Sequence, residues 1–250
     1  MAKQDKSDRR AMLESMRSQQ KNADRRRNFM IVGVCCLIAL LIVGAAAYGP
    51  IKNRYDLAKF NDIQLADIGA AASVCGEVKK VPATGGSEHV QEPTPLAYPE
   101  APPAFGQHYD VWEGLERKLY TKADRPPVGR LVHNMEHGFT ILWYDESVAD
   151  DPDQMETLRG LAAKFKGTDN YRLKFKASPW LAGDGEAFPK DQHIAFTHWS
   201  VGGVGDNATG EQAGVWQYCS EVSGAALEQF MLDYPYTDAP EPSVGDMGTG

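Results

Sequence analysis

The stretch FMIVGVCCLIALLIVGAAAYG, residues 29–49, determines the overall organisation of this chain of 250 residues. It contains twenty-one uncharged and mostly apolar residues. As a helix rising about 1.5 Å per residue, it spans about 30 Å, the thickness of the hydrocarbon core of a membrane. Few helices of soluble proteins are apolar on every side. We therefore predict one N-terminal transmembrane helix over residues 29–49, which anchors the chain in the lipid bilayer.

The charges on the two sides of this stretch have opposite signs. Residues 1–28 hold nine Lys and Arg against four Asp and Glu, a net charge of +5, whereas residues 51–250 carry −13. The positive-inside rule predicts that residues 1–28 form a cytoplasmic basic arm and that the remainder is extracytoplasmic. The arm is short and the body is acidic, which argues against nucleic-acid binding. Ala45–Ala47 also fit a signal-peptide cleavage site, an alternative that would export the same domain.

The cysteines agree with an exported domain. Cys35 and Cys36 lie inside the apolar stretch, so Cys75 and Cys219 are the two in the exported part. An even number of cysteines in an oxidising compartment favours a disulfide between Cys75 and Cys219. Two free thiols are the alternative.

Helix and strand patterns alternate irregularly along the exported part, which predicts an α+β fold. FTILWY, residues 139–144, is the clearest strand because it is uncharged and rich in β-branched and aromatic residues. Further strands are predicted at 171–177, with Arg172, Lys174 and Lys176 on the outer face, and at 193–199. Helices are predicted at 51–72, 152–166 and 224–232.

These patterns divide the exported part into three regions. Residues 50–74 are expected to be a membrane-proximal helix or linker, and residues 75–234 a single small mixed extracytoplasmic domain. Within that domain, residues 82–107 are rich in Pro and Gly and are predicted to form a long loop. Residues 235–250 combine Pro, Gly and acidic residues, so we expect a disordered tail.

The segment LVHNMEHG, residues 131–138, is the strongest candidate for a functional site. In a strand, His133, Met135 and His137 would share one face, and two imidazoles with a thioether suit copper. In a helical turn, His133 and His137 would still share a face at positions i and i+4. The segment therefore indicates a transition-metal site for copper or zinc. Two other interpretations are open: buried histidines that brace a loop, or an acid/base pair that includes Glu136.

A second motif, PPAFGQHY at residues 102–109, predicts a rigid turn that presents His108 in a defined position. A fixed imidazole can serve a binding site, whereas the same turn can also cover a sheet edge. The metalloprotease motif is absent from this sequence, because Asn134 rather than Glu follows His133.

Three blocks together resemble a known family. PPAFGQH (102–108), VHNMEHG (132–138) running into FTILWY, and AFTHW (195–199) are similar to the bacterial, largely actinobacterial, membrane-anchored domain-of-unknown-function family numbered 3105. The chain departs from the family pattern at Phe105, where members tend to have Ser, and at Met135, where they tend to have Leu. The resemblance implies that the thioether is not a general ligand, and it leaves His108, His133, Glu136 and His137 as candidates. It implies an architecture and a location but no reaction.

Three functions remain open from the sequence. The first is an anchored extracytoplasmic domain that binds a transition metal through its histidines. The second is a non-enzymatic scaffold that docks a protein of the cell envelope and uses the histidines structurally. The third is a hydrolase or transferase with His137 and Glu136 as acid and base, which lacks a recognisable nucleophile.

Overall fold

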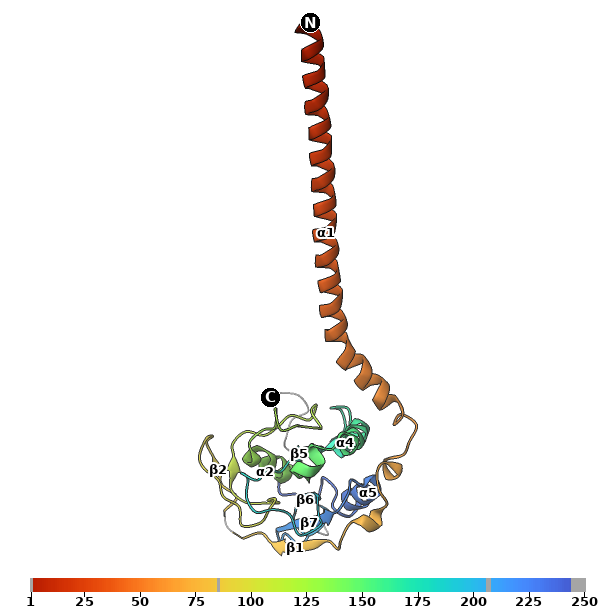
Figure 1. The fold of residues 1–250 in the computed structure, drawn as a ribbon. Coiled ribbons are helices and arrows are strands. Elements are labelled where there is room, and N and C mark those ends of the chain that lie inside the picture. Colours follow the sequence, from red (N-terminus) through yellow and green to blue (C-terminus); the bar gives the residue numbers. More distant parts are fainter. Residues whose placement is uncertain (1, 85, 206–207, 244–250) are drawn as a thin grey trace. The chain divides into compact units, whose positions relative to one another are not determined.

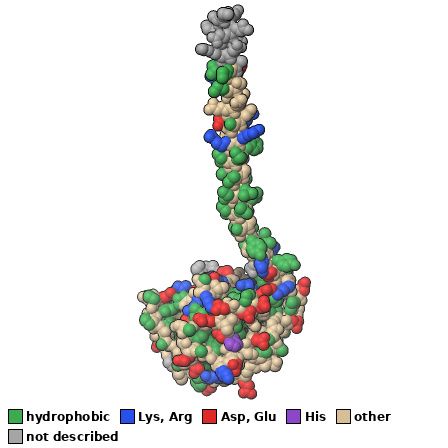
Figure 2. Space-filling view, viewed as in Figure 1, with side chains coloured by type: hydrophobic (Ala, Val, Ile, Leu, Met, Phe, Trp, Pro, Cys, Tyr) green, Lys and Arg blue, Asp and Glu red, His purple; other side chains and the backbone are tan. Residues whose placement is uncertain are grey.

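The computed structural model describes residues 2–84, 86–205 and 208–243. The chain divides into two compact units, Met1–Asp56 and Leu57–Gly250 (Figure 1). Helix α1 (Ala2–Ala58) provides most of the first unit, and its large apolar residues between Phe29 and Tyr55 are exposed (Figure 2). By length and composition, it is the one helix of the described residues that is apolar enough to cross a membrane.

A five-stranded sheet forms the centre of the second unit, with strand order β1-β7-β6-β4-β5. Its strands are β1 (Lys79–Pro82), β4 (Thr140–Tyr144), β5 (Phe175–Pro179), β6 (Ile194–Ser200) and β7 (Ala213–Cys219). Only β4 and β5 pair in parallel; the other pairs of this sheet are antiparallel. The expected α+β class is confirmed.

Each face of the sheet packs against its own apolar cluster, as the alternation of side chains along a strand requires. Leu142 and Tyr144 face a cluster that includes residues of α4 (Pro152–Lys164) and α5 (Gly224–Asp233). Ile141 and Trp143 face a second cluster built with α2 (Val128–Glu136). The sheet thus separates α4 and α5 on one side from α2 on the other.

The short elements of the described residues are two β-strands, a short α-helix and three 3-10 turns. The strands β2 (His89–Val90) and β3 (His108–Tyr109) form a small parallel sheet of their own. The helical pieces are η1 (Leu65–Asp67), η2 (Ala72–Val74), α3 (Glu146–Ala149) and η3 (Tyr171–Leu173).

The helix predicted at 51–72 is wrong beyond Ala58, where α1 ends. The Ala70 amide donates to the Val222 carbonyl at 2.8 Å, and the Gly224 amide donates to the Ile68 carbonyl, also at 2.8 Å. These backbone bonds to the start of α5 replace helical ones. The turns η1 and η2 instead allow Ile68, which is 1% exposed, to enter the core.

The strand predicted at 171–177 begins later and has a different outer face. β5 starts at Phe175, and both Lys174 and Lys176 are buried rather than solvent-facing. The Lys176 ammonium donates to the carbonyls of Gly114 and Arg117, at 2.5 and 2.9 Å. Backbone carbonyls therefore take the place of water around this amine.

The disulfide between Cys75 and Cys219 is present. It connects the segment before β1 to the end of β7.

The prediction of a disordered tail from Pro235 is wrong for residues 235–243, which pack against the domain as a C-terminal strap. Asp238 is 3% exposed, and its carboxylate accepts hydrogen bonds from Ser200 Oγ and from the Val201 and Gly203 amides. A buried acid is tolerated because its oxygens are satisfied in this way. Residues 244–250 lie outside the described residues.

Candidate metal centre

The two short strands bring together histidines that are nineteen positions apart in the sequence. His89 and His108 are register partners in the parallel β2–β3 pair, so their side chains lie next to each other. Their ring centroids are 4.6 Å apart. The Pro-rich loop therefore carries a site residue that the sequence analysis did not single out.

The last turn of helix α2 and the residue that follows it supply three more candidates. His133, Glu136 and His137 occupy positions i, i+3 and i+4, which project from one side of a helix. The strand interpretation of this segment is wrong. Pro127 precedes the helix, and Gly138, with φ of 84°, ends it in the left-handed conformation that favours glycine.

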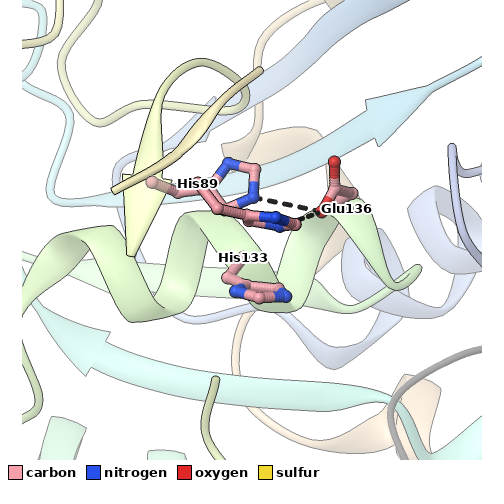
Figure 3. A group of neighbouring side chains, drawn as sticks. His89, His133 and Glu136 are labelled. Atoms are coloured by element: carbon pink, nitrogen blue, oxygen red, sulfur yellow. Dashed lines mark hydrogen bonds and ion pairs between the residues drawn. The ribbon is translucent and has the colours of Figure 1, made fainter. Parts of the chain in front are cut away.

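Three imidazoles and one carboxylate converge where these elements meet. His89, His108, His133 and Glu136 each offer one donor atom, and these atoms all lie within 4.8 Å of one another. Figure 3 shows the Glu136 carboxylate directed toward the His89 ring, with His133 on the same helix. Glu136 Oε2 lies 3.2 Å from His89 Nε2 and 3.1 Å from His108 Nε2. Such a group can hold a transition-metal ion.

Backbone carbonyls fix the orientation of two of these rings. His108 Nδ1 lies 2.8 Å from the Gly106 carbonyl, and His133 Nδ1 lies 2.5 Å from the Tyr109 carbonyl. Because a carbonyl only accepts, each Nδ1 is assigned the hydrogen. Each Nε2 then carries the lone pair that could bind a metal, and His108 Nε2 faces Glu136 Oε2, so an ion there would take the place of that contact.

Burial sets the electrostatics of the group. Burial, together with the charges of His137, His108 and His89, outweighs the hydrogen bond to the Tyr109 carbonyl and lowers the pKa of His133 to about 4. Burial by itself would raise the pKa of Glu136, but hydrogen bonds and positive charge from His108 and His89 outweigh it, so the pKa is lowered. The imidazole is thus kept neutral and the carboxylate ionised, which are the forms that bind metals.

His137 and Met135 lie outside this group of four. His137 forms a second group with Glu136 and Glu241, whose donor atoms are also within 4.8 Å of one another. Met135 is fully buried in the core, where its sulfur accepts a hydrogen bond from Thr197 Oγ1 at 3.2 Å. Two positions after His133, a helical residue points to the opposite side, which explains this placement.

Two candidate ligands were missed from the sequence. His89 lies in the loop of residues 82–107, and Glu241 lies in the expected tail. In the sequence, only its residue type marks His89 as a possible ligand, because His108, which lies beside it in the fold, is nineteen positions away. Glu241 gave no signal among the many acidic residues of the chain.

The chain is therefore an α+β protein with a long apolar N-terminal helix and a histidine- and glutamate-rich group between a helix and a two-stranded sheet. It belongs to the family described as "Protein of unknown function (DUF3105)", whose model matches residues 89–247. The match begins at His89 and includes every candidate ligand named above. No curated protein and no solved structure matches the chain.

Proposed function

We propose that the C-terminal domain binds a transition-metal ion, zinc or copper, on the outer side of a membrane in which α1 anchors it. The observation that carries the proposal is the convergence of His89, His108, His133 and Glu136 within 4.8 Å. The backbone carbonyls that hold His108 and His133 support it, because they direct Nε2 of both rings to the group.

The donor types limit the choice of metal. Imidazole nitrogens and a carboxylate oxygen suit Zn²⁺ and Cu²⁺, whereas Cu⁺ prefers sulfur ligands. Met135, the nearest thioether in the sequence, is held in the core. We therefore favour a divalent ion.

The anchor and the compartment rest on separate observations. Helix α1 is long and apolar enough to cross a membrane, and no residue of its most apolar stretch is buried. The disulfide is typical of proteins outside the cytoplasm. Protease added to intact spheroplasts is expected to digest the domain; a domain that stays protected until the membrane is permeabilised would contradict this orientation.

Metal content tests the site. The full chain, purified in detergent without affinity histidines, is stripped with a chelator, reloaded separately with Zn²⁺ or Cu²⁺, desalted and measured by mass spectrometry. We expect at least one bound ion per chain, and about one ion fewer in His89→Ala. Folded protein that retains neither metal would overturn the proposal.

His193→Ala is the matched control. Both side chains are about half exposed, 45% for His89 and 41% for His193, but His193 contacts Asp145 and Ser147 instead of the group. The control is expected to bind as much metal as the wild type. Equal losses in the two variants would mean that the ion is not held by the group.

A further inference from the structure

The second group, Glu136, His137 and Glu241, adjoins the first and shares one residue with it. Glu136 has two carboxylate oxygens, and Oε2 alone faces His89 and His108. A carboxylate can coordinate one ion through each oxygen. We propose that the domain holds a dinuclear divalent-metal centre in which Glu136 bridges the two ions, an inference that rests on the proposed function.

His137 gives an independent observation at the second position. Its side chain is 2% exposed, and its Nδ1 lies 3.3 Å from the Glu241 carbonyl and 3.8 Å from Glu241 Oε2. Its Nε2 is buried and has no hydrogen-bond partner among the described residues. Buried polar atoms of native proteins almost always have a partner, so we expect a ligand at this nitrogen.

The two ring systems are close enough for neighbouring ions. The centroids of His133 and His137 are 4.6 Å apart; His133 lies in the last turn of α2 and His137 directly follows the helix. Metal ions in two-metal sites lie about 3.5–4 Å apart. Rings this close can each hold one ion of such a pair, with Glu136 between the two ions.

The strap delivers the remaining ligand. Glu241 donates its backbone amide to the Glu136 carbonyl at 2.9 Å, and the Lys174 ammonium donates to the Pro242 carbonyl at 2.9 Å. These bonds hold residues 241 and 242 over the end of α2, although the Glu241 side chain is 47% exposed. The fold therefore places a carboxylate over the site from the C-terminal side.

The two positions differ in chemistry. The first has three imidazoles and one carboxylate, whereas the second has one imidazole and two carboxylates. Carboxylate-rich sites favour harder ions, and exposure of Glu241 weakens retention. We expect the first position to fill before the second.

Stoichiometry distinguishes this inference from the proposed function. The full chain in detergent is titrated with Zn²⁺ and bound metal is counted, for the wild type, Glu241→Gln and the control Glu228→Gln, an exposed residue of α5. We expect two ions per chain in the wild type and the control, and one in Glu241→Gln. One ion in all three proteins would overturn the dinuclear centre and leave the proposed function intact. Two bound ions in Glu241→Gln would overturn the role of Glu241 as a ligand. No bound ion in the wild type would overturn the proposed function itself.

Electron paramagnetic resonance of the Cu²⁺-loaded chain tests the bridge. Two Cu²⁺ ions that share Glu136 couple magnetically, so the fully loaded wild type is expected to give less than half of the signal of two isolated ions. Glu241→Gln is expected to give the full signal of one isolated ion. A wild type with two ions and the full signal of both would overturn the bridge. Tryptophan fluorescence during unfolding confirms that both variants are folded.

Discussion

Asp238 provides a sharp test of how the strap is held. Its carboxylate accepts three hydrogen bonds: from Ser200 Oγ at 2.7 Å, from the Val201 amide at 3.0 Å and from the Gly203 amide at 2.9 Å. Asp238→Ala leaves all three donors unpaired. Each is worth about 1–1.5 kcal/mol at a partly buried position, so we expect a loss of about 3–4 kcal/mol in the free energy of unfolding.

Asp238→Asn is the matched variant. Its amide oxygen can still accept from Val201 and Gly203, and its NH₂ group can donate to Ser200 Oγ, so the expected loss is about 1 kcal/mol. Urea unfolding of the full chain in detergent is followed by tryptophan fluorescence. All five tryptophans lie between residues 112 and 216, so α1 does not contribute to the signal. A loss below about 1 kcal/mol in Asp238→Ala, or equal losses in both variants, would refute this account of the strap.

Three further perturbations test separate parts of the fold. Cys75→Ala combined with Cys219→Ala opens a loop with a sequence separation of 144, which is expected to cost about 5 kcal/mol in the same unfolding assay. Burial lowers the pKa of Lys176 to about 7, so the unfolded chain binds the extra proton between pH 7 and 10. The free energy of unfolding therefore rises with pH there by at most about 1.4 kcal/mol per unit from this group, and a pH series on Lys176→Met should be flatter. Gly138→Ala places a Cβ at 2.1 Å from the Tyr236 carbonyl oxygen and strains a φ of 84°, so a stability loss above about 1 kcal/mol and weaker metal retention are expected. Wild-type values in any of these assays would contradict the corresponding contact.

The sequence predicts those elements whose reasons are local. β4 is recognisable because all five of its residues are uncharged and either apolar, aromatic or β-branched. Helix α4 is recognisable because Asp151 caps it and Pro152 occupies its first position. The pairing of Cys75 with Cys219 is favoured by their even number in the part predicted to be exported, and the disulfide is present.

Burial that depends on contacts with residues far away in the chain cannot be predicted from the local sequence. Lys176 alternates like an outward-facing residue, but the carbonyls that receive its ammonium belong to residues about sixty positions earlier. The strap has the composition of a disordered tail, yet Asp238 finds its donors at residues 200–203. In both cases a polar side chain can be buried because residues far away in the sequence provide its hydrogen-bond partners.

The sequence predicts His108, His133, Glu136 and His137 as candidate ligands, but not His89 and Glu241. The spacing of His133, Glu136 and His137 carries information because one helix orients all three. His89 depends on its register with His108, and that register is a property of the folded loop. Local sequence therefore indicates ligands that share a helix, or that follow a Pro-rich turn as His108 does, and gives no signal for His89 and Glu241, whose positions depend on tertiary contacts.

The difference in exposure between the ligands leads to a last prediction. His108 is fully buried and Glu136 has 8% of its side chain exposed, whereas 45% of the His89 side chain is exposed. Folding alone therefore fixes His108 and Glu136, whereas His89 would complete the proposed metal site from the surface. In metal-free protein, His89→Ala should cost less than about 1 kcal/mol, whereas His108→Ala, which removes a packed ring, should cost about 2–4 kcal/mol. Both variants should lose metal. If His89→Ala proved as damaging to unfolding as His108→Ala, the outer histidine would be part of the folded framework, and metal retention could not be separated from stability at this site.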